Sequence, residues 1–305
     1  MRCALLHLDD SLLRQPKLQQ AVRTRGGPAW SARDIGPALR LWARAATLQE
    51  MKARLRAHVP AADGPKLVFA GSGDFHHVSG LLIERALEVC DRPLTILHFD
   101  NHPDWMGHAP GRHCGSWVGR AARLQGVARI VTVGVCSQDI GARRARQGDL
   151  KLVEEDRLDL YAWTAPDGGD VVRVGDRAWP TISALGEDAF LALLDAAIPT
   201  ATVYVTIDKD VLQASEAVTN WDQGQASLRF LVRAVERIAG NRKVVGGDVV
   251  GDWSAAAYGG DLAARLLKRG EAMLDQPWRR SSPDDAAINQ AANLRLLELF
   301  DGIAA

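Results

Sequence analysis

The feature that most constrains this chain is the alternation of two hydrophobic patterns along most of its length. Short apolar runs rich in β-branched residues predict strands, at residues 3–8, 66–71, 94–99, 129–135, 202–207 and 243–250. Between most of them lie segments with apolar residues three and four positions apart, such as VSGLLIERALEVC and SLRFLVRAVERIAG, which predict helices. Because parallel strands need long crossover connections, the alternation predicts an α/β fold: a doubly wound, mostly parallel sheet flanked by helices on both faces.

Three regions depart from this alternation. Residues 32–58 predict one or two amphipathic helices, and residues 165–184 carry Gly, Asp and Pro around VVRV, which predicts a β-hairpin insertion. A polar connection at 276–287 precedes a last helix, INQAANLRLLELF. At 305 residues, without an internal repeat or a convincing linker, the chain is expected to form one domain, 1–305.

Composition and charge narrow the classes of partner. The 37 Lys and Arg residues balance the 37 Asp and Glu residues, so no excess charge favours nucleic acid or an anionic membrane. A small-molecule substrate is the expected partner. No run of 18 apolar residues and no signal-like N-terminal segment occur, which predicts a soluble, cytoplasmic protein. The four cysteines show no C-x-x-C pairing and are expected to be reduced thiols.

Six of the eight histidines lie between positions 76 and 113. The first two, His76 and His77, stand in GSGDFHHVSG, where a predicted strand ends in glycines and a helix follows. In open α/β sheets the crevice at the carboxyl ends of the strands is where ligands bind. A histidine pair at such a place can also serve packing or capping, so this segment alone decides nothing.

The segment LHFDNHPDW is more specific. Asp100, His102 and Asp104 alternate after a strand, so in an extended chain their side chains point to the same side. Two carboxylates with one imidazole suit Mn²⁺, and also Zn²⁺, Co²⁺, Ni²⁺ or Fe²⁺, better than they suit a purely oxygen-ligated ion. The alternative, a solvated acidic loop, would leave two carboxylates repelling each other without a cation.

A second acidic pair follows a later strand. TVYVTIDKDVL ends in Asp208 and Asp210, again alternating and again at a predicted carboxyl end. Four carboxylates at one sheet edge are hard to keep ionised without metal, and five or six ligands exceed what one tetrahedral ion needs. The sequence therefore predicts two divalent ions, bridged by carboxylates and a water.

At these positions the sequence resembles the ureohydrolase family of arginases, agmatinases and formiminoglutamases. The matching segments are GSGDFHH, DNHPD at 100–104, HCGSW at 113–117 and DKD at 208–210, in the family's order. The resemblance covers roughly residues 67–253 and implies a two-Mn²⁺ hydrolase that cleaves a non-peptide C–N bond of a guanidino, amidino or formimino compound. It also implies that the chain can form homo-oligomers, as the family does.

Carried over by position, the resemblance implies roles for individual residues. His77 completes the metal ligands, because the helix after it then falls in register with the family's helix; His76 is the alternative. His113 is implied to be the proton shuttle, and Asp104 to act in catalysis as well as in ligation. Asp139 is implied to contact the polar end of the substrate, with a helix N-cap as its alternative role. The implied metal ligands are His77, Asp100, His102, Asp104, Asp208 and Asp210.

The chain departs from the family's pattern at the guanidinium-binding glutamate. Gly251 stands at that position in GGDVVGDWS, beside Asp252, so the carboxylate that would pair with a planar cation is shifted by one residue or missing. Arginine is therefore a doubtful substrate. The segment AVTNWDQGQAS also differs from the family's. Its Asn220, Trp221 and Asp222 are candidate substrate contacts, and so is Asp252 beside Gly251.

Two other classes of function stay open at this stage. A deacetylase-like hydrolase of the related single-zinc fold would also use Asp and His at strand ends, and the HH pair at 76–77 superficially fits it. A metal-binding relative without ureohydrolase activity is the second alternative. The count of metal ions per chain separates the first from a binuclear enzyme, and a screen of C–N compounds tests the second.

Overall fold

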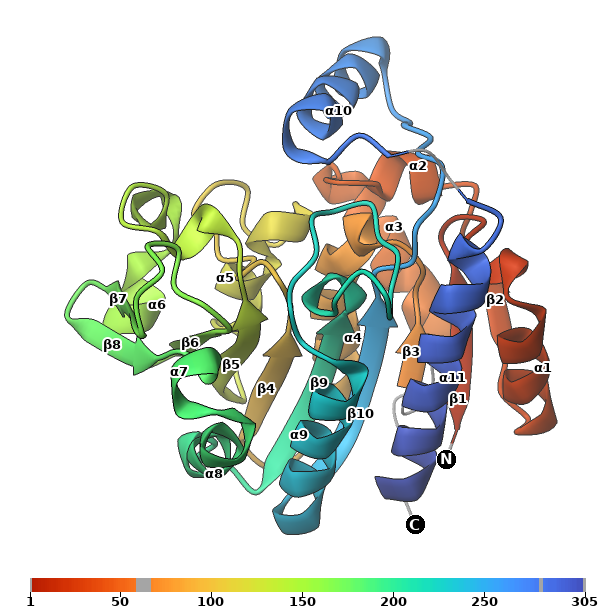
Figure 1. Ribbon diagram of the computed structural model, residues 1–305. Helices are drawn as coiled ribbons and strands as arrows, with labels where there is room; N and C mark the ends of the chain where they lie inside the picture. Colours follow the sequence, from red (N-terminus) through yellow and green to blue (C-terminus); the bar gives the residue numbers. More distant parts are fainter. Residues whose placement is uncertain (1, 59–66, 280–281, 304–305) are drawn as a thin grey trace.

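The computed structural model describes residues 2–58, 67–279 and 282–303. Its centre is an eight-stranded sheet in which every neighbouring pair is parallel, in the order β2-β1-β3-β10-β9-β4-β5-β6 (Figure 1). The strands are β1 (Cys3–His7), β2 (Ala29–Ser31), β3 (Leu67–Phe69), β4 (Leu94–Phe99), β5 (Val127–Val135), β6 (Leu158–Ala162), β9 (Thr202–Asp208) and β10 (Lys243–Val250). The predicted α/β class, with a mostly parallel sheet, is confirmed.

Helices cover both faces of this sheet. On one face α1, α11, α9 and α8 pack in a row, and α3, α4 and α5 pack together on the other. Two consecutive residues of β10 show the two faces: Gly247 lies against Phe300 of α11, whereas Asp248 accepts a hydrogen bond from Ser79 of α4. The helices are α1 (Pro16–Thr24), α2 (Gly36–Leu39), α3 (Ala45–His58), α4 (Ser79–Leu87), α5 (Trp117–Ala121), α6 (Leu150–Glu154), α7 (Ile182–Leu185), α8 (Glu187–Ala197), α9 (Leu228–Asn241), α10 (Leu262–Asp275) and α11 (Asp285–Ile303).

Most of the predicted elements agree with the structure. The six predicted strands are present, and the hairpin expected within 165–184 is formed by β7 (Val171–Val174) and β8 (Arg177–Pro180), which pair antiparallel. Residue 66 of one predicted strand and residues 280–281 of the predicted connection lie outside the described residues. The sequence analysis does not predict strands β2 and β6 or helices α1, α6, α7 and α10. Among the described residues, no helix has the length and apolar character needed to cross a membrane.

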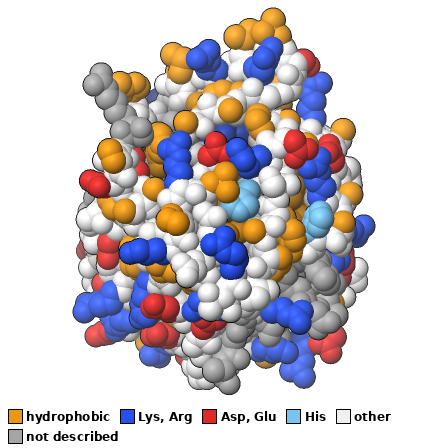
Figure 2. Space-filling model, turned by 90° about the vertical axis from the view of Figure 1, so that its right-hand side faces the viewer, with side chains coloured by type: hydrophobic (Ala, Val, Ile, Leu, Met, Phe, Trp, Pro, Cys, Tyr) orange, Lys and Arg blue, Asp and Glu red, His pale blue; other side chains and the backbone are white. Residues whose placement is uncertain are grey.

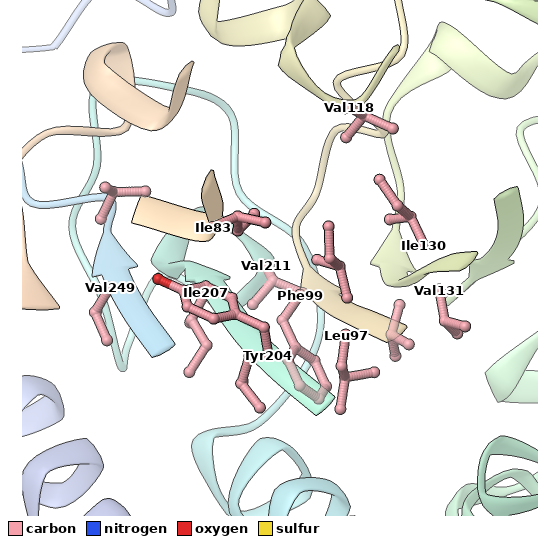
Figure 3. Close-up of a cluster of buried hydrophobic side chains, with 14 of the residues drawn as sticks. Ile83, Leu97, Phe99, Val118, Ile130, Val131, Tyr204, Ile207, Val211 and Val249 are labelled. Atoms are coloured by element: carbon pink, nitrogen blue, oxygen red, sulfur yellow. The ribbon is translucent and has the colours of Figure 1, made fainter. Parts of the chain in front are cut away.

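The carboxyl ends of four neighbouring strands, β3, β10, β9 and β4, lie at one edge of the sheet. Phe99, Ile207 and Val249, the apolar residues at the ends of β4, β9 and β10, belong to the buried cluster shown in Figure 3. Chain order reverses here, since β1 leads to β3 on one side whereas β4, β5 and β6 continue on the other. Such a reversal opens a crevice at the carboxyl edge, and the ends of β3, β10, β9 and β4 lie side by side along it.

Candidate metal centre

Short turns after three of the four strands carry the polar side chains of this edge. After β3, Ser72 caps the 3-10 helix Gly73–Val78 by accepting a hydrogen bond from the backbone N–H of Asp74 at 3.2 Å. After β9, Asp208 caps the 3-10 helix Lys209–Val211 through the N–H of Asp210 at 3.0 Å. Because each turn is fixed by its own cap, the side chains within it have defined directions.

The first group of converging ligand atoms is built around His76. Its Nδ1 atom lies 3.0 Å from an oxygen of Asp100, 3.0 Å from an oxygen of Asp104 and 3.7 Å from an oxygen of Asp208. Despite these distances, Nδ1 makes no hydrogen bond with suitable direction to any described residue. The nitrogen and the carboxylate oxygens therefore face a common point, as ligands of one ion do.

The protonation of His76 is set from the other side of its ring. Thr206 donates its hydroxyl proton to Asp248, so the Thr206 oxygen accepts from His76 Nε2–H at 3.0 Å. Because Nε2 keeps its proton, Nδ1 is the nitrogen that would release a proton and offer its lone pair to an ion bound among the carboxylates. Partners that fix the tautomer in this way are typical of metal-binding histidines, and this donor set fits a divalent ion.

A second group shares one carboxylate with the first. Asp100, His102 and Asp210 bring one ligand atom each to within 4.8 Å of one another. His102 Nδ1 lies 3.0 Å from Asp210 and its Nε2 lies 3.0 Å from Asp222. Asp210 also accepts from the backbone N–H of Asn101 at 3.0 Å, which holds the carboxylate in place. Because both groups contain Asp100, the geometry fits two neighbouring ions with a shared ligand.

Two glycines, Gly73 and Gly251, make room for the carboxylate of Asp208. A Cβ atom at Gly73 would lie 2.4 Å from one oxygen of Asp208, and a Cβ at Gly251 would lie 2.4 Å from the other. Gly251 also has φ +92°, a left-handed conformation that side chains disfavour. The absence of a glutamate at Gly251 is thus part of the packing around Asp208, and no side chain fits there without moving it.

The cluster is electrostatically incomplete without cations. Burial first, and neighbouring carboxylates second, raise the pKa of Asp208 to about 8 and that of Asp210 to about 7. Burial lowers the pKa of His76 and His102, but the adjacent carboxylates outweigh it and leave both pKa values well above the usual range. Bound divalent ions would supply the missing positive charge.

These pKa shifts predict that the folding stability of the metal-free protein depends on pH. Asp208 and Asp210 keep protons in the folded state that the unfolded chain releases near pH 4, so unfolding releases protons and stability falls as pH rises. Buried His77, whose pKa is lowered to about 3, opposes this mainly below its unfolded value of about 6.5. We expect the melting temperature of chelator-treated protein to decrease from about pH 6.5 to 7.5.

Excess Mn²⁺ should reverse that trend, because metal binding requires deprotonated carboxylates and so strengthens with pH. Thermal unfolding at matched ionic strength, with and without Mn²⁺, measures both slopes. A melting temperature of the metal-free protein that rises over this interval would contradict the burial of ionisable carboxylates at the edge.

His77 does not lie where it was predicted. Both of its ring nitrogens are buried without a hydrogen-bond partner among the described residues, and neither belongs to a ligand group. The 3-10 helix Gly73–Val78 directs the neighbouring His76 to the carboxylates instead. The geometry therefore favours His76, the alternative that the sequence leaves open, and the choice of ligand stays a prediction.

The predicted substrate contacts also change. Asp252 is buried outside the cavity, where it binds Lys209 at 2.5 Å and Gln15 at 2.9 Å, and it is withdrawn as a substrate contact. Asn220 uses both ends of its amide on Ser254, at 2.9 and 3.0 Å, so its role is to hold a loop. Asp222 lines the cavity but is bonded to His102, whose ring it orients.

Asp139 does line the cavity, near Arg144 at 3.3 Å. It is not an N-cap: Ser137 occupies that position of the 3-10 helix Gln138–Ile140. The contact of Asp139 with a substrate stays a prediction, and its oxygens accept from Ser137 and Arg144 at 3.3 Å.

One further residue of the site, His98, was missed from the sequence. It lies on β4 two positions before Asp100 and therefore on the same side of the strand. Its Nε2 is 2.8 Å from Asp100 and its Nδ1 is 3.1 Å from Thr132. The histidine had been read as part of an apolar strand, although its spacing from Asp100 was the signal that could have found it.

A cavity of about 1180 Å³ opens onto the two ligand groups. His113 lines it, with Nδ1 accepting from the backbone N–H of Gly115 at 2.8 Å. The ring proton is therefore on Nε2, which lies 2.5 Å from Glu271 of α10. Trp42, Trp105 and Trp221 are part of the wall. The cavity thus combines an acidic floor, a histidine able to give a proton, and large aromatic surfaces.

Comparisons with known proteins place the fold. No protein-family model matches the chain. An uncharacterized protein of Thermotoga maritima is 25% identical over 186 residues, which are 61% of this chain and 58% of that protein. The chain therefore spans less than two thirds of the length of this relative.

Solved structures match over almost the whole chain. An arginase from Bacillus caldovelox matches with a TM-score of 0.57 and 14% identity, over 96% of this chain and 97% of its own. A hypothetical agmatinase from Burkholderia thailandensis matches with a TM-score of 0.53 and 18% identity, over 98% of this chain and 86% of its own. A formimidoylglutamase from Bacillus subtilis matches with a TM-score of 0.52 and 14% identity, over 97% of this chain and 87% of its own. At these identities the likeness shows the fold, which is that of the ureohydrolases, and confirms at this level the resemblance seen in the sequence.

Proposed function

We propose that this chain, which has the ureohydrolase fold, is a divergent hydrolase of the ureohydrolase type. It holds two divalent ions, preferably Mn²⁺, and cleaves a non-peptide C–N bond of a guanidino, amidino or formimino compound. The observation that carries the proposal is the pair of ligand groups that share Asp100 at the base of an open cavity. The proposed ligands are His76, Asp100, His102, Asp104, Asp208 and Asp210.

Different residues of the site would orient the metal ligands and supply a proton. Divalent ions at this edge would lower the pKa of a bound water and so supply hydroxide near neutral pH. Trp117 donates to Asp104 at 2.7 Å and His98 bonds to Asp100, so both carboxylates are oriented from behind. His113 Nε2–H bonds to Glu271 Oε1 at 2.5 Å in the cavity wall, so the His113–Glu271 pair is the proposed source of the proton for the departing nitrogen.

A deacetylase-like hydrolase with one zinc ion remains the second candidate. The observation that favours it is that His98 lies beside three members of the first group: His76, His98, Asp100 and Asp104 offer four ligand atoms within 4.8 Å of one another. Four such ligands would satisfy one tetrahedral Zn²⁺. The second group, around His102 and Asp210, has no use in that mechanism.

A release assay tests the proposed reaction and the role of His113 together. Mn²⁺-loaded protein is incubated with guanidino, amidino and formimino compounds, and urea, ammonia and formamide are measured. On the compound that is turned over, His113→Ala should keep its metal content and lose about 10²- to 10⁴-fold in rate, the usual contribution of a general acid. Release from none of the compounds would indicate a catalytically silent relative, and full activity of His113→Ala would refute the assignment of that residue.

A further inference from the structure

The cavity lacks a carboxylate where the ureohydrolase resemblance places one. A side chain at Gly251 would collide with Asp208 and with the backbone N–H of Lys209, at 2.4 and 2.5 Å. The adjacent Asp252 is bonded to Lys209 and Gln15 and does not line the cavity. Neither residue can bind a cationic substrate, so any carboxylate for that purpose must come from another element.

Helix α10 brings such a carboxylate over the site from the far end of the chain. Figure 1 shows α10 beyond the carboxyl ends of the strands, and Figure 2 shows hydrophobic side chains at that same end of the molecule. Leu266, Leu267 and Leu274 line the cavity from this helix, yet they are 60%, 65% and 86% exposed. The helix thus turns an unfilled apolar face, together with Glu271, toward the cavity.

Polar contacts on both sides hold Glu271 at the wall of the cavity. Lys268, one turn earlier, donates to the backbone oxygen of Ala38 at 2.7 Å and lies 4.7 Å from the centre of the Trp42 ring. Gln276, just after the helix, donates to Asp74 at 2.6 Å. Because α10 is anchored before and after Glu271, the contact of Glu271 with His113 is built into the fold.

Glu271 has capacity left for a ligand. One carboxylate oxygen, Oε1, is 2.5 Å from His113 Nε2, and no described residue donates a hydrogen bond to Oε2. The side chain is 23% exposed and lines the cavity. A carboxylate held beside the proton donor is placed to accept N–H groups from the same group of the substrate that His113 protonates.

We propose that Glu271 is the specificity-determining residue of this pocket, selecting substrates whose scissile carbon is part of a guanidinium or amidinium cation over neutral ureas and amides. The inference rests on the proposed function. It assigns to α10 the recognition that Gly251 cannot provide, and it places the apolar remainder of the substrate against Leu266, Leu267 and Leu274.

A matched pair of probes tests this selection without turnover. N-butylguanidinium and N-butylurea share a shape and differ in charge, and their binding to Mn²⁺-loaded protein is measured by calorimetry. Wild-type protein should prefer the cation by at least about tenfold, because a hydrogen bond to a charged group contributes more than a neutral one. Glu271→Gln, which keeps the shape of the side chain, should reduce the preference to about twofold or less.

Asp275→Asn is the control variant. Asp275 lies one turn from Glu271, lines the same cavity, and loses the same charge. Retention of the preference in Asp275→Asn, with its loss in Glu271→Gln, supports the assignment. Equal losses in both variants, or a preference that survives in Glu271→Gln, would overturn it. Metal content of each variant is measured separately, so failure of the metal centre is distinguished from failure of Glu271.

Discussion

Asp208→Asn is expected to reduce the metal content to at most one ion per chain and to lower turnover by at least about a thousandfold. Asp208 reaches the first ligand group with one oxygen and caps its own 3-10 helix with the other. Asn has the same shape but only one weakly coordinating oxygen and no charge. Gly73 and Gly251 pack closely against the carboxylate, so the isosteric Asn is the replacement that disturbs the packing least.

Metal content by mass spectrometry and the release assay measure this loss. Asp159→Asn is a suitable control, because Asp159 is a buried sheet aspartate on β6 that pairs with Arg129 at 3.0 Å and lies outside the cavity. It should keep both ions. Wild-type metal content and activity in Asp208→Asn would mean that the carboxylate is structural.

The second large effect concerns two adjacent histidines. His76→Ala should lose at least one ion and most activity, because it removes the nitrogen that faces Asp100 and Asp104. His77→Ala should keep both ions and stay within a few-fold of wild-type rate, since its ring nitrogens bind none of the described residues. Both variants leave a buried cavity of similar size, and thermal unfolding establishes that both are folded.

Their comparison discriminates between the two registers of GSGDFHH. Loss of metal in His77→Ala with retention in His76→Ala would restore the ligand that the family resemblance implied. Equal metal content and equal activity of the two variants would contradict the assignment of His76 to the first ligand group.

Much of this site is predictable because strand periodicity is local. Asp100 and Asp208 follow apolar strands directly, and parallel strands end at one edge. The choice between His76 and His77 is not predictable in the same way, because a 3-10 turn and an α-helical turn place consecutive residues in different directions.

Elements with weak or remote signals were missed for other reasons. Strand β2 has three residues and lies at the edge of the sheet, and β6 includes an aspartate that is stabilised by Arg129. Glu271 is separated from His113 by 158 positions, so no spacing along the chain connects them. Contacts of this kind depend on how the last third of the chain returns over the sheet.

The most direct test of the central claim is the number of metal ions per chain. Protein stripped with chelator, reloaded with Mn²⁺ and freed of excess metal would be analysed by mass spectrometry against an accurate protein concentration. The binuclear centre predicts two ions per chain. A single tightly held Zn²⁺, with no second ion bound at saturating Mn²⁺, would contradict it and favour the deacetylase-like alternative.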